Sequence, residues 1–337
     1  MQRPAAPRRQ SPLDSLRSAL AFGARGARRV IQPAADGLAG DLSGSAGGLL
    51  QESFVRRLER LNLLMRGRVP EGVAGEHRSR RYASSAEFAD FRRYVPGDDF
   101  RRIDWNAYAR LDGLFLKLTE ATVEIPVHVL VDCSRSMNWG TPNKLGFARR
   151  LGAAIGYLAL ARFDALSTAC FADELYERLP VIRGKAQASR LLDYLDQAPI
   201  GTATRLERAM AAYCATAPRS GLAFLISDLL TEDNWQAGVL QLLRNGLNVV
   251  VVHVLAPAEL NPMHLGEIEL LDSETGDVVE LVVGNEARRT YQERVRTWCA
   301  EVESFCQRSE VGHLQLVTTM ELEEIFLNRM RHRRIVR

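Results

Sequence analysis

Short apolar runs alternate with longer amphipathic runs from Ile125 to the end of the chain. Residues 127–131 and 249–255 are short and rich in valine, which indicates buried strands. Residues 145–161 and 235–244 have the length and the apolar spacing of helices. Strands that alternate with helices pair in parallel through right-handed crossovers. The pattern therefore predicts an α/β fold with a doubly wound, mostly parallel sheet.

The same reading places the remaining elements. Strands are expected at residues 114–118, 166–171, 222–226 and 314–317, a hairpin at 267–283, and helices at 191–195, 206–217 and 291–305. Ligands of doubly wound folds bind beyond the carboxyl ends of the strands. The residues that follow these strands are therefore the first candidates for function.

The first part of the chain has a different pattern. Residues 1–46 are rich in Ala, Arg, Gly, Pro and Ser, and they contain too few large apolar side chains to offset the entropy of ordering. Residues 49–68 have apolar positions at helical spacing, and the stretch after them is polar, aromatic and rich in turns. We therefore expect a disordered segment 1–46, a smaller helix-plus-β region 47–124, and the doubly wound domain 125–337.

Composition is that of an ordinary globular chain. Its 337 residues are 46% hydrophobic and 25% charged, and a formal net charge of +3 does not require nucleic acid or a membrane as partner. No apolar run approaches the ~20 residues of a membrane span. The five cysteines form no C-x-x-C pair, and their odd number argues against a disulfide framework. We therefore expect a cytoplasmic protein with reduced thiols.

The apolar run 127–131 ends in a D-x-S-x-S motif formed by Asp132, Ser134 and Ser136. Hard cations prefer oxygen ligands, and one carboxylate with two hydroxyls on a tight loop can supply part of the octahedral shell of Mg²⁺, with waters completing it. Asp and Ser also cap helices that follow strands. The motif alone leaves both interpretations open.

Two further loops favour a cation. Thr204 precedes an expected helix, and Asp228 closely follows the apolar run 222–226. Both positions lie at the carboxyl edge of the predicted sheet, so they can bring a hydroxyl and a second carboxylate to the same cation. We expect Asp132 to begin an exposed loop.

These residues resemble the metal-ion-dependent adhesion site (MIDAS) of von Willebrand factor A domains, in which D-x-S-x-S is followed by T-x-L at a helix start and by a strand that ends in Asp. The resemblance implies a von Willebrand factor A-like domain in which Ser134 and Ser136 bind the cation directly. It implies that Thr204 binds directly or through water, and that Asp132 and Asp228 mainly hold coordinated waters. The implied cofactor is Mg²⁺ or another divalent cation such as Mn²⁺ or Ca²⁺.

A block of residues upstream of the first apolar run limits the resemblance to a smaller group of proteins. Residues 94–105 read Y-V-P-G-D-D-F-R-R-I-D-W, preceded by Glu87-Phe88 and followed by Ala109-Arg110. This block is similar to the signature of the DUF58 family, and the resemblance runs from about Leu49 to the C-terminus. The residues that could form a structural signature or a docking surface are Pro96, Gly97, Asp98, Asp99, Arg102, Asp104, Trp105 and Arg110.

The family resemblance also implies a setting. Members are often found beside MoxR-type AAA+ ATPases in bacteria, which implies such an ATPase as a partner in protein maturation or remodelling. Many members carry N-terminal membrane helices, and this chain resembles the soluble branch. Of the two roles open to the block, docking and an ion-paired brace, we expect the brace, with Trp105 buried against the α/β domain.

The expected function is binding. A cation held mainly by neutral hydroxyls keeps much of its charge, so it can accept a carboxylate from a partner protein as its last ligand. We therefore predict a metal-dependent protein-binding or assembly module rather than an enzyme. The alternative is a metal-dependent hydrolase or phosphotransfer enzyme that uses the same cation, but these loops offer no obvious His, Lys or Glu as general base. Nucleic acid is not an expected partner, and His128 and His253, inside apolar runs, are interpreted as core histidines.

Overall fold

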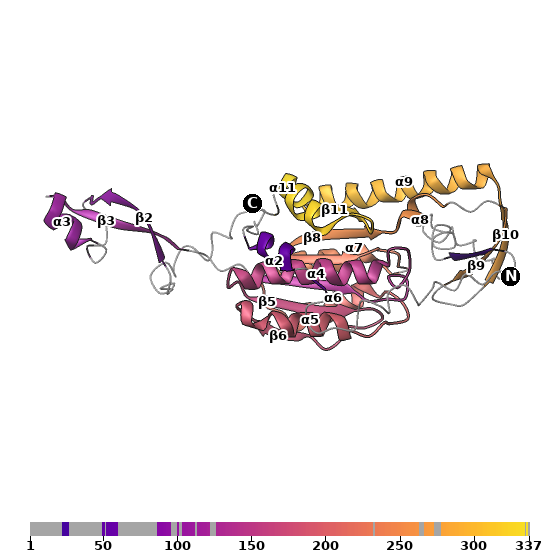
Figure 1. Ribbon diagram of the computed structural model, residues 1–337, viewed down its shortest axis with the longest axis horizontal. Helices are drawn as coiled ribbons and strands as arrows, with labels where there is room; N and C mark the ends of the chain where they lie inside the picture. Colours follow the sequence, from indigo (N-terminus) through magenta and orange to yellow (C-terminus); the bar gives the residue numbers. More distant parts are fainter. Residues whose placement is uncertain are drawn as a thin grey trace, which may run out of the picture. The chain divides into compact units, whose positions relative to one another are not determined.

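The computed structural model describes residues 22–26, 49–50, 52–59, 86–95, 100, 103–111, 113–121, 126–231, 233–262, 266–272, 278–333 and 335. The chain divides into two compact units. The larger comprises Met1–Arg66 and Ile125–Arg337, and the smaller comprises Gly67–Glu124. The larger unit carries the main sheet, and the smaller one carries a pair of strands with a helix (Figure 1).

A six-stranded sheet forms the centre of the larger unit, in the order β11-β8-β7-β4-β5-β6. All neighbours are parallel except β5 and β6. The chain leaves β4 toward β5 and returns on the other side of β4 as β7, so the switch point lies between β4 and β7. The strands are β4 (Val127–Asp132), β5 (Leu166–Phe171), β6 (Leu179–Ile182), β7 (Gly221–Ser227), β8 (Leu247–Leu255) and β11 (Gly312–Val317).

Helices cover both faces of this sheet. Two of them, α4 (Lys144–Ala161) and α5 (Ala188–Gln197), contribute to the hydrophobic cluster on one face. Three others, α6 (Leu206–Thr216), α7 (Trp235–Arg244) and α9 (Asn285–Arg308), contribute to the cluster on the other face. Because both faces are buried, the strands read as continuous apolar runs in the sequence.

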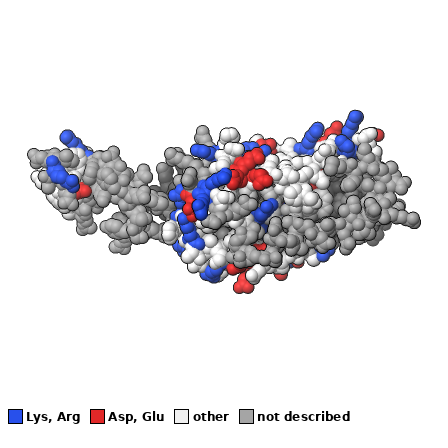
Figure 2. Space-filling model, in the orientation of Figure 1, with Lys and Arg blue, Asp and Glu red and all other residues white. Residues whose placement is uncertain are grey.

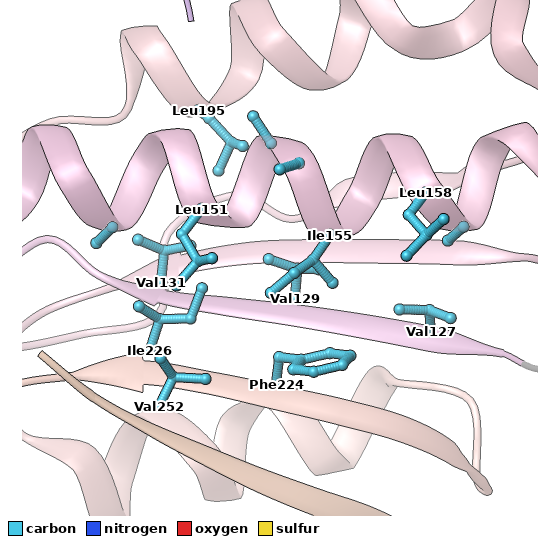
Figure 3. Packing of buried hydrophobic residues seen from close by; sticks show 14 of the residues in the cluster. Val127, Val129, Val131, Leu151, Ile155, Leu158, Leu195, Phe224, Ile226 and Val252 are labelled. Atoms are coloured by element: carbon cyan, nitrogen blue, oxygen red, sulfur yellow. The ribbon is translucent and has the colours of Figure 1, made fainter. Parts of the chain in front are cut away.

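Strand β4 shows how the core is divided. Val129 and Val131 belong to the same cluster as Leu151 and Ile155 of α4 (Figure 3), whereas Leu130 belongs to the cluster on the opposite face. Successive side chains of a strand point to opposite faces of the sheet. The valines and the leucine of one short run therefore stabilise two separate layers of helices.

Shorter elements complete the larger unit. They are α2 (Glu52–Leu58), η3 (Lys185–Gln187), α8 (Pro257–Leu260), α10 (Leu322–Glu324), the π-helical turn η4 (Ile325–Arg329) and α11 (Met330–His332). A second, antiparallel sheet has the order β1-β9-β10, with β1 (Phe22–Gly26), β9 (Gly266–Asp272) and β10 (Val278–Val283). On the face drawn in Figure 2, the described Lys and Arg side chains are interspersed with Asp and Glu.

The doubly wound α/β class predicted from the sequence is confirmed. The strands expected at residues 166–171 and 222–226 correspond to β5 and β7. Strand β6, which pairs antiparallel at the edge of the sheet, was not expected. The segment 1–46 contributes β1, and its other residues lie outside the described part of the chain.

The smaller unit consists of β2 (Ala86–Arg93), β3 (Phe115–Ala121) and α3 (Trp105–Leu111). The two strands are antiparallel. Asp104 caps α3, because its Oδ1 accepts a hydrogen bond from the backbone N–H of Ala107 at 3.0 Å. Within the signature block, Arg110 is exposed in the last turn of α3, whereas Pro96, Gly97, Asp98, Asp99 and Arg102 lie outside the described residues.

Within the smaller unit, Trp105 lies on an exposed side of α3. Its side chain is 63% exposed, and its ring packs edge-on against Tyr108 with 6.2 Å between the ring centroids. Among the described side chains of this short helix, Ala107 is the buried one. A side chain two residues away from the buried position points to a different side of a helix, and this turns Trp105 outward.

Replacing Trp105 with alanine is therefore expected to change the free energy of unfolding by no more than about 0.5 kcal/mol, as for other exposed positions. Denaturant unfolding followed by circular dichroism measures the change. Trp298→Ala is the matched control: Trp298 is buried under the main sheet, and its loss should cost about 3–5 kcal/mol. A comparable cost for Trp105→Ala would show that Trp105 is buried after all.

Candidate metal centre

The two central strands end side by side at the carboxyl edge of the main sheet. Asp132 is the last residue of β4, Ser227 is the last residue of β7, and Asp228 follows it. Because β4 and β7 are hydrogen-bonded neighbours, these residues meet at the switch point. Thr204, which lies just before α6, reaches the same edge through a hydrogen bond to Asp132.

A hydrogen-bonded cluster surrounds the Asp132 carboxylate. Its Oδ1 accepts from the backbone N–H of Ser134 at 2.9 Å. Its Oδ2 accepts from the hydroxyls of Ser227 at 2.6 Å and Thr204 at 3.4 Å. The hydroxyl oxygens of Ser134 and Ser136 are 3.0 Å apart. The structure therefore brings these residues together as one cluster of oxygen atoms.

The cluster is buried. Asp132 and Ser134 have no exposed surface, and Ser136 and Thr204 are also buried. The expectation that Asp132 begins an exposed loop is therefore wrong. Its carboxylate is enclosed because the loop after β4 folds back so that a backbone N–H donates to it, while hydroxyls approach from two other segments of the chain.

The charges in the cluster suit a hard cation. Burial, together with the negative charge of Asp228, raises the pKa of Asp132 to about 7. The two carboxylates thus destabilise each other when both are ionised. A divalent cation would offset that repulsion, and hydroxyl and carboxylate oxygens are the donors that Mg²⁺ prefers. In the part of the chain that the structure describes, no three His, Cys, Asp or Glu side chains form a metal-binding group, so a cation here would depend on the hydroxyls.

Asp228 is held by a buried ion-pair triad. Its Oδ1 accepts from the backbone N–H of Leu230 at 3.0 Å, and its Oδ2 accepts from Nζ of Lys144 at 2.7 Å. Nζ of Lys144 also donates to Oε1 of Glu259 at 2.5 Å. Burial disfavours the charge on Lys144, but the two carboxylates outweigh it and raise the pKa of the ammonium group. Lys144 therefore stays protonated at neutral pH.

Both the side-chain carboxylate and the backbone carbonyl of Glu259 accept hydrogen bonds. Its Oε2 accepts from the backbone N–H of Ala256 at 2.7 Å, and its backbone carbonyl accepts from the hydroxyl of Tyr291 at 2.8 Å. The triad of Lys144, Asp228 and Glu259 thus connects the start of α4, the end of β7, and α8, and Tyr291 joins it to α9. We refer to these three residues as the lysine triad.

Sequence reasoning missed Lys144 and Glu259. A lysine at the start of a helix reads as a surface residue, and only the tertiary fold turns this one inward. Glu259 stands two residues after Pro257, which is a signal for a helix start but gives no sign of a buried side chain. Ser227 carried a weak signal, since it directly precedes Asp228 at the end of an apolar run.

His128 and His253 are both fully buried in strands of the sheet. Nδ1 of His128 lies 2.7 Å from the hydroxyl of Tyr213, and its Nε2 lies 3.2 Å from the carbonyl oxygen of Ser220. Burial lowers the pKa of His128 to about 4 and that of His253 to about 3. Both rings are therefore neutral at physiological pH.

The fold and the cluster together define a doubly wound α/β protein with an oxygen-rich polar centre at its switch point. A family model described as "Protein of unknown function DUF58" matches residues 90–300. This match covers more than half of the chain, and the chain belongs to the DUF58 family. It is 27% identical over 242 residues to the uncharacterized proteins Mb1516 of Mycobacterium bovis and Rv1480 of Mycobacterium tuberculosis, which covers 70% of this chain and 76% of each relative.

Solved structures show weaker likenesses. The conserved hypothetical protein BatB from Bacteroides thetaiotaomicron has a TM-score of 0.36 at 16% identity, over 57% of this chain and 90% of that one. Proximal thread matrix protein 1 from the mussel byssus, with a zinc-occupied MIDAS motif, has a TM-score of 0.33 at 13% identity, over 40% and 39%. None of the described helices is both long and apolar enough to cross a membrane.

Proposed function

We propose that this chain is a metal-dependent protein-binding or assembly module. In this proposal Ser134, Ser136 and Thr204 bind a divalent cation through their hydroxyls, and Asp132 and Asp228 hold its coordinated waters. The bound cation supplies a positive charge that accepts a carboxylate oxygen from a partner protein. The observation that carries the proposal is the buried oxygen cluster around Asp132 at the switch point of the sheet.

The ligand chemistry points to Mg²⁺, with Mn²⁺ or Ca²⁺ as other hard cations that such oxygens accept. We further propose a MoxR-type AAA+ ATPase as a partner, which is supported by the resemblance of the signature block. A cytoplasmic location is supported by the five free cysteines, which suit a reducing compartment. The ring of Trp105, which is exposed within the smaller unit, supports docking as the role of that block.

A capture experiment tests the proposal. The full chain is immobilised and offered a purified MoxR-type ATPase and its client fraction in Mg²⁺ or in EDTA, with Asp132→Asn as the control bait. We expect capture in Mg²⁺ only, and none by the variant. Equal capture in Mg²⁺ and in EDTA, and by the wild type and the variant, would contradict the proposal.

The enzyme alternative is tested in the same samples. Mg²⁺-dependent turnover of p-nitrophenyl phosphate that is lost in Asp132→Asn would favour a phosphoester hydrolase. The nearest buried lysine does not favour that function, because a general base must be unprotonated and Lys144 is held in its charged form by Asp228 and Glu259.

A further inference from the structure

A charged lysine lies at the edge of the candidate metal centre. Lys144 is 1% exposed, and its partners Asp228 and Glu259 are 0% and 2% exposed. An ammonium group is costly to bury, and only good geometry with both partners makes such an ion pair tolerable. A lysine serving only to start a helix would extend into water, so its burial here requires another explanation.

The position of the ammonium group affects one carboxylate of the cation site directly. Nζ of Lys144 donates a hydrogen bond to Oδ2 of Asp228, and the backbone N–H of Leu230 donates one to Oδ1. Both oxygens of Asp228 thus already have donors. A cation near Asp132 meets a carboxylate that is fixed in orientation and partly neutralised by a positive charge in contact with it.

Glu259 decides how strongly the ammonium group holds Asp228. Its carboxylate shares Nζ of Lys144, and it is itself fixed by the backbone of Ala256. An ammonium group that is divided between two carboxylates attracts each of them less than it would attract one alone. Glu259 therefore draws Lys144 away from Asp228, although it lies outside the cluster of hydroxyls.

We propose that Lys144 is a positioning residue of the cation site, which orients Asp228 for a coordinated water and competes with the divalent cation for that carboxylate. Glu259 moderates this competition. The lysine triad thereby sets how tightly the site holds its cation, and a weakly held cation keeps more charge for a partner's carboxylate. This inference rests on the cation site of the proposed function, and it adds the residues that tune it.

Titration with Mn²⁺ tests the proposal, because isothermal calorimetry and electron paramagnetic resonance both report its binding. The variants are Glu259→Gln, Lys144→Gln, and the double variant Lys144→Gln/Glu259→Gln in the full chain. The double variant removes one positive and one negative charge, so the net charge of the centre is that of the wild type. It also removes the ammonium group that pairs with Asp228. It should bind Mn²⁺ at least about tenfold more tightly, which corresponds to about 1.4 kcal/mol.

Glu259→Gln should have the opposite effect. It leaves the ammonium group paired with Asp228 alone, so Mn²⁺ binding should weaken about three- to tenfold. A purely structural triad, which only ties α4, β7 and α8 together, predicts weaker binding in every variant. The reversal of sign between Glu259→Gln and the double variant is therefore the diagnostic result. Adding Asp132→Asn to the double variant should abolish the gain, which places it at the same site.

The outcomes separate this inference from the proposed function. If the wild type binds Mn²⁺ and the double variant binds it equally or more weakly, the role of Lys144 is refuted and the cation site stands. If only the double variant binds, through Asp132, the competition is supported and the wild-type chain is not a metal-dependent module. If neither binds, both ideas are overturned. Should the lysine variants fail to fold, Glu259→Gln decides through two readouts, Mn²⁺ affinity and the melting temperature of the metal-free chain. Weaker binding with an unchanged melting temperature supports the proposal, whereas unchanged or tighter binding, or weaker binding with a lowered melting temperature, refutes it.

Discussion

Replacing Asp132 with asparagine should weaken divalent-cation binding about 10- to 100-fold while the chain keeps its fold. Residues that orient a metal's ligands or waters commonly contribute that much to affinity. Asparagine is preferable to alanine here, because its side-chain oxygen can still accept hydrogen bonds from the Ser134 backbone or from the hydroxyls of Ser227 and Thr204. The substitution removes the charge and leaves the shape of the cluster in place.

Unfolding in the presence and absence of Mg²⁺ measures this effect. At a Mg²⁺ concentration of about 100 times the wild-type Kd, binding stabilises the native state by about 2.7 kcal/mol, and a site weakened 100-fold gains only about 0.4 kcal/mol. Asp196→Asn, the same chemical change at an exposed position of α5, should retain the full gain. The site assignment fails if Asp132→Asn is stabilised as much as the wild type, or if it unfolds without metal.

Acid should destabilise the wild-type chain more than a His128→Gln variant. Burial lowers the pKa of His128 from 6.5 to about 4. As the pH falls, the imidazole of the unfolded chain is therefore protonated near pH 6.5, whereas that of the folded chain is protonated only near pH 4. Stability is therefore lost as the pH falls through that window. Between pH 7 and pH 5 the wild type should lose about 2 kcal/mol more than the variant, since one pKa unit corresponds to about 1.4 kcal/mol.

Denaturant unfolding at pH 7, 6 and 5 checks this prediction. The raised pKa of Asp132 contributes the opposite trend, but it does so in both proteins and cancels in the comparison. His332→Gln, at an exposed position near the C-terminus, should follow the wild type. Parallel pH profiles for the wild type and His128→Gln would mean that the imidazole titrates normally in the folded chain.

Most strands of the main sheet can be predicted from the sequence because each of these strands is encoded by a local run of residues. A run such as Val127–Asp132 of β4 is apolar at every position before its final Asp except His128, and a strand buried on both faces is rich in such apolar residues. The candidate cluster was also accessible, since Asp132, Ser134 and Asp228 all follow such runs. Parallel strands of one sheet end at the same edge, so the positions along the chain were enough to group these residues.

Two other features depend on long-range packing that no local pattern encodes. Lys144 and Glu259 are separated by 115 positions, and each alone reads as a surface residue of a helix start. Trp105 is a large aromatic residue of a type that is often buried, yet among the described side chains of its helix it is Ala107 that is buried. Hydrophobicity predicts that a side chain tends to be buried, whereas the direction in which a short helix presents it is a tertiary property.

The sequence separations within the candidate metal centre have a further consequence for folding. The hydrogen bonds that assemble it join residues 72, 84, 95 and 115 positions apart. Contacts between such distant positions form late, because the intervening loops must first be closed. The centre therefore exists only after β4, β7 and the helices between them have reached their native topology. The proposed cation binding would consequently be a measure of completed folding, and a fragment that ends before Glu259 lacks the residue that balances Lys144.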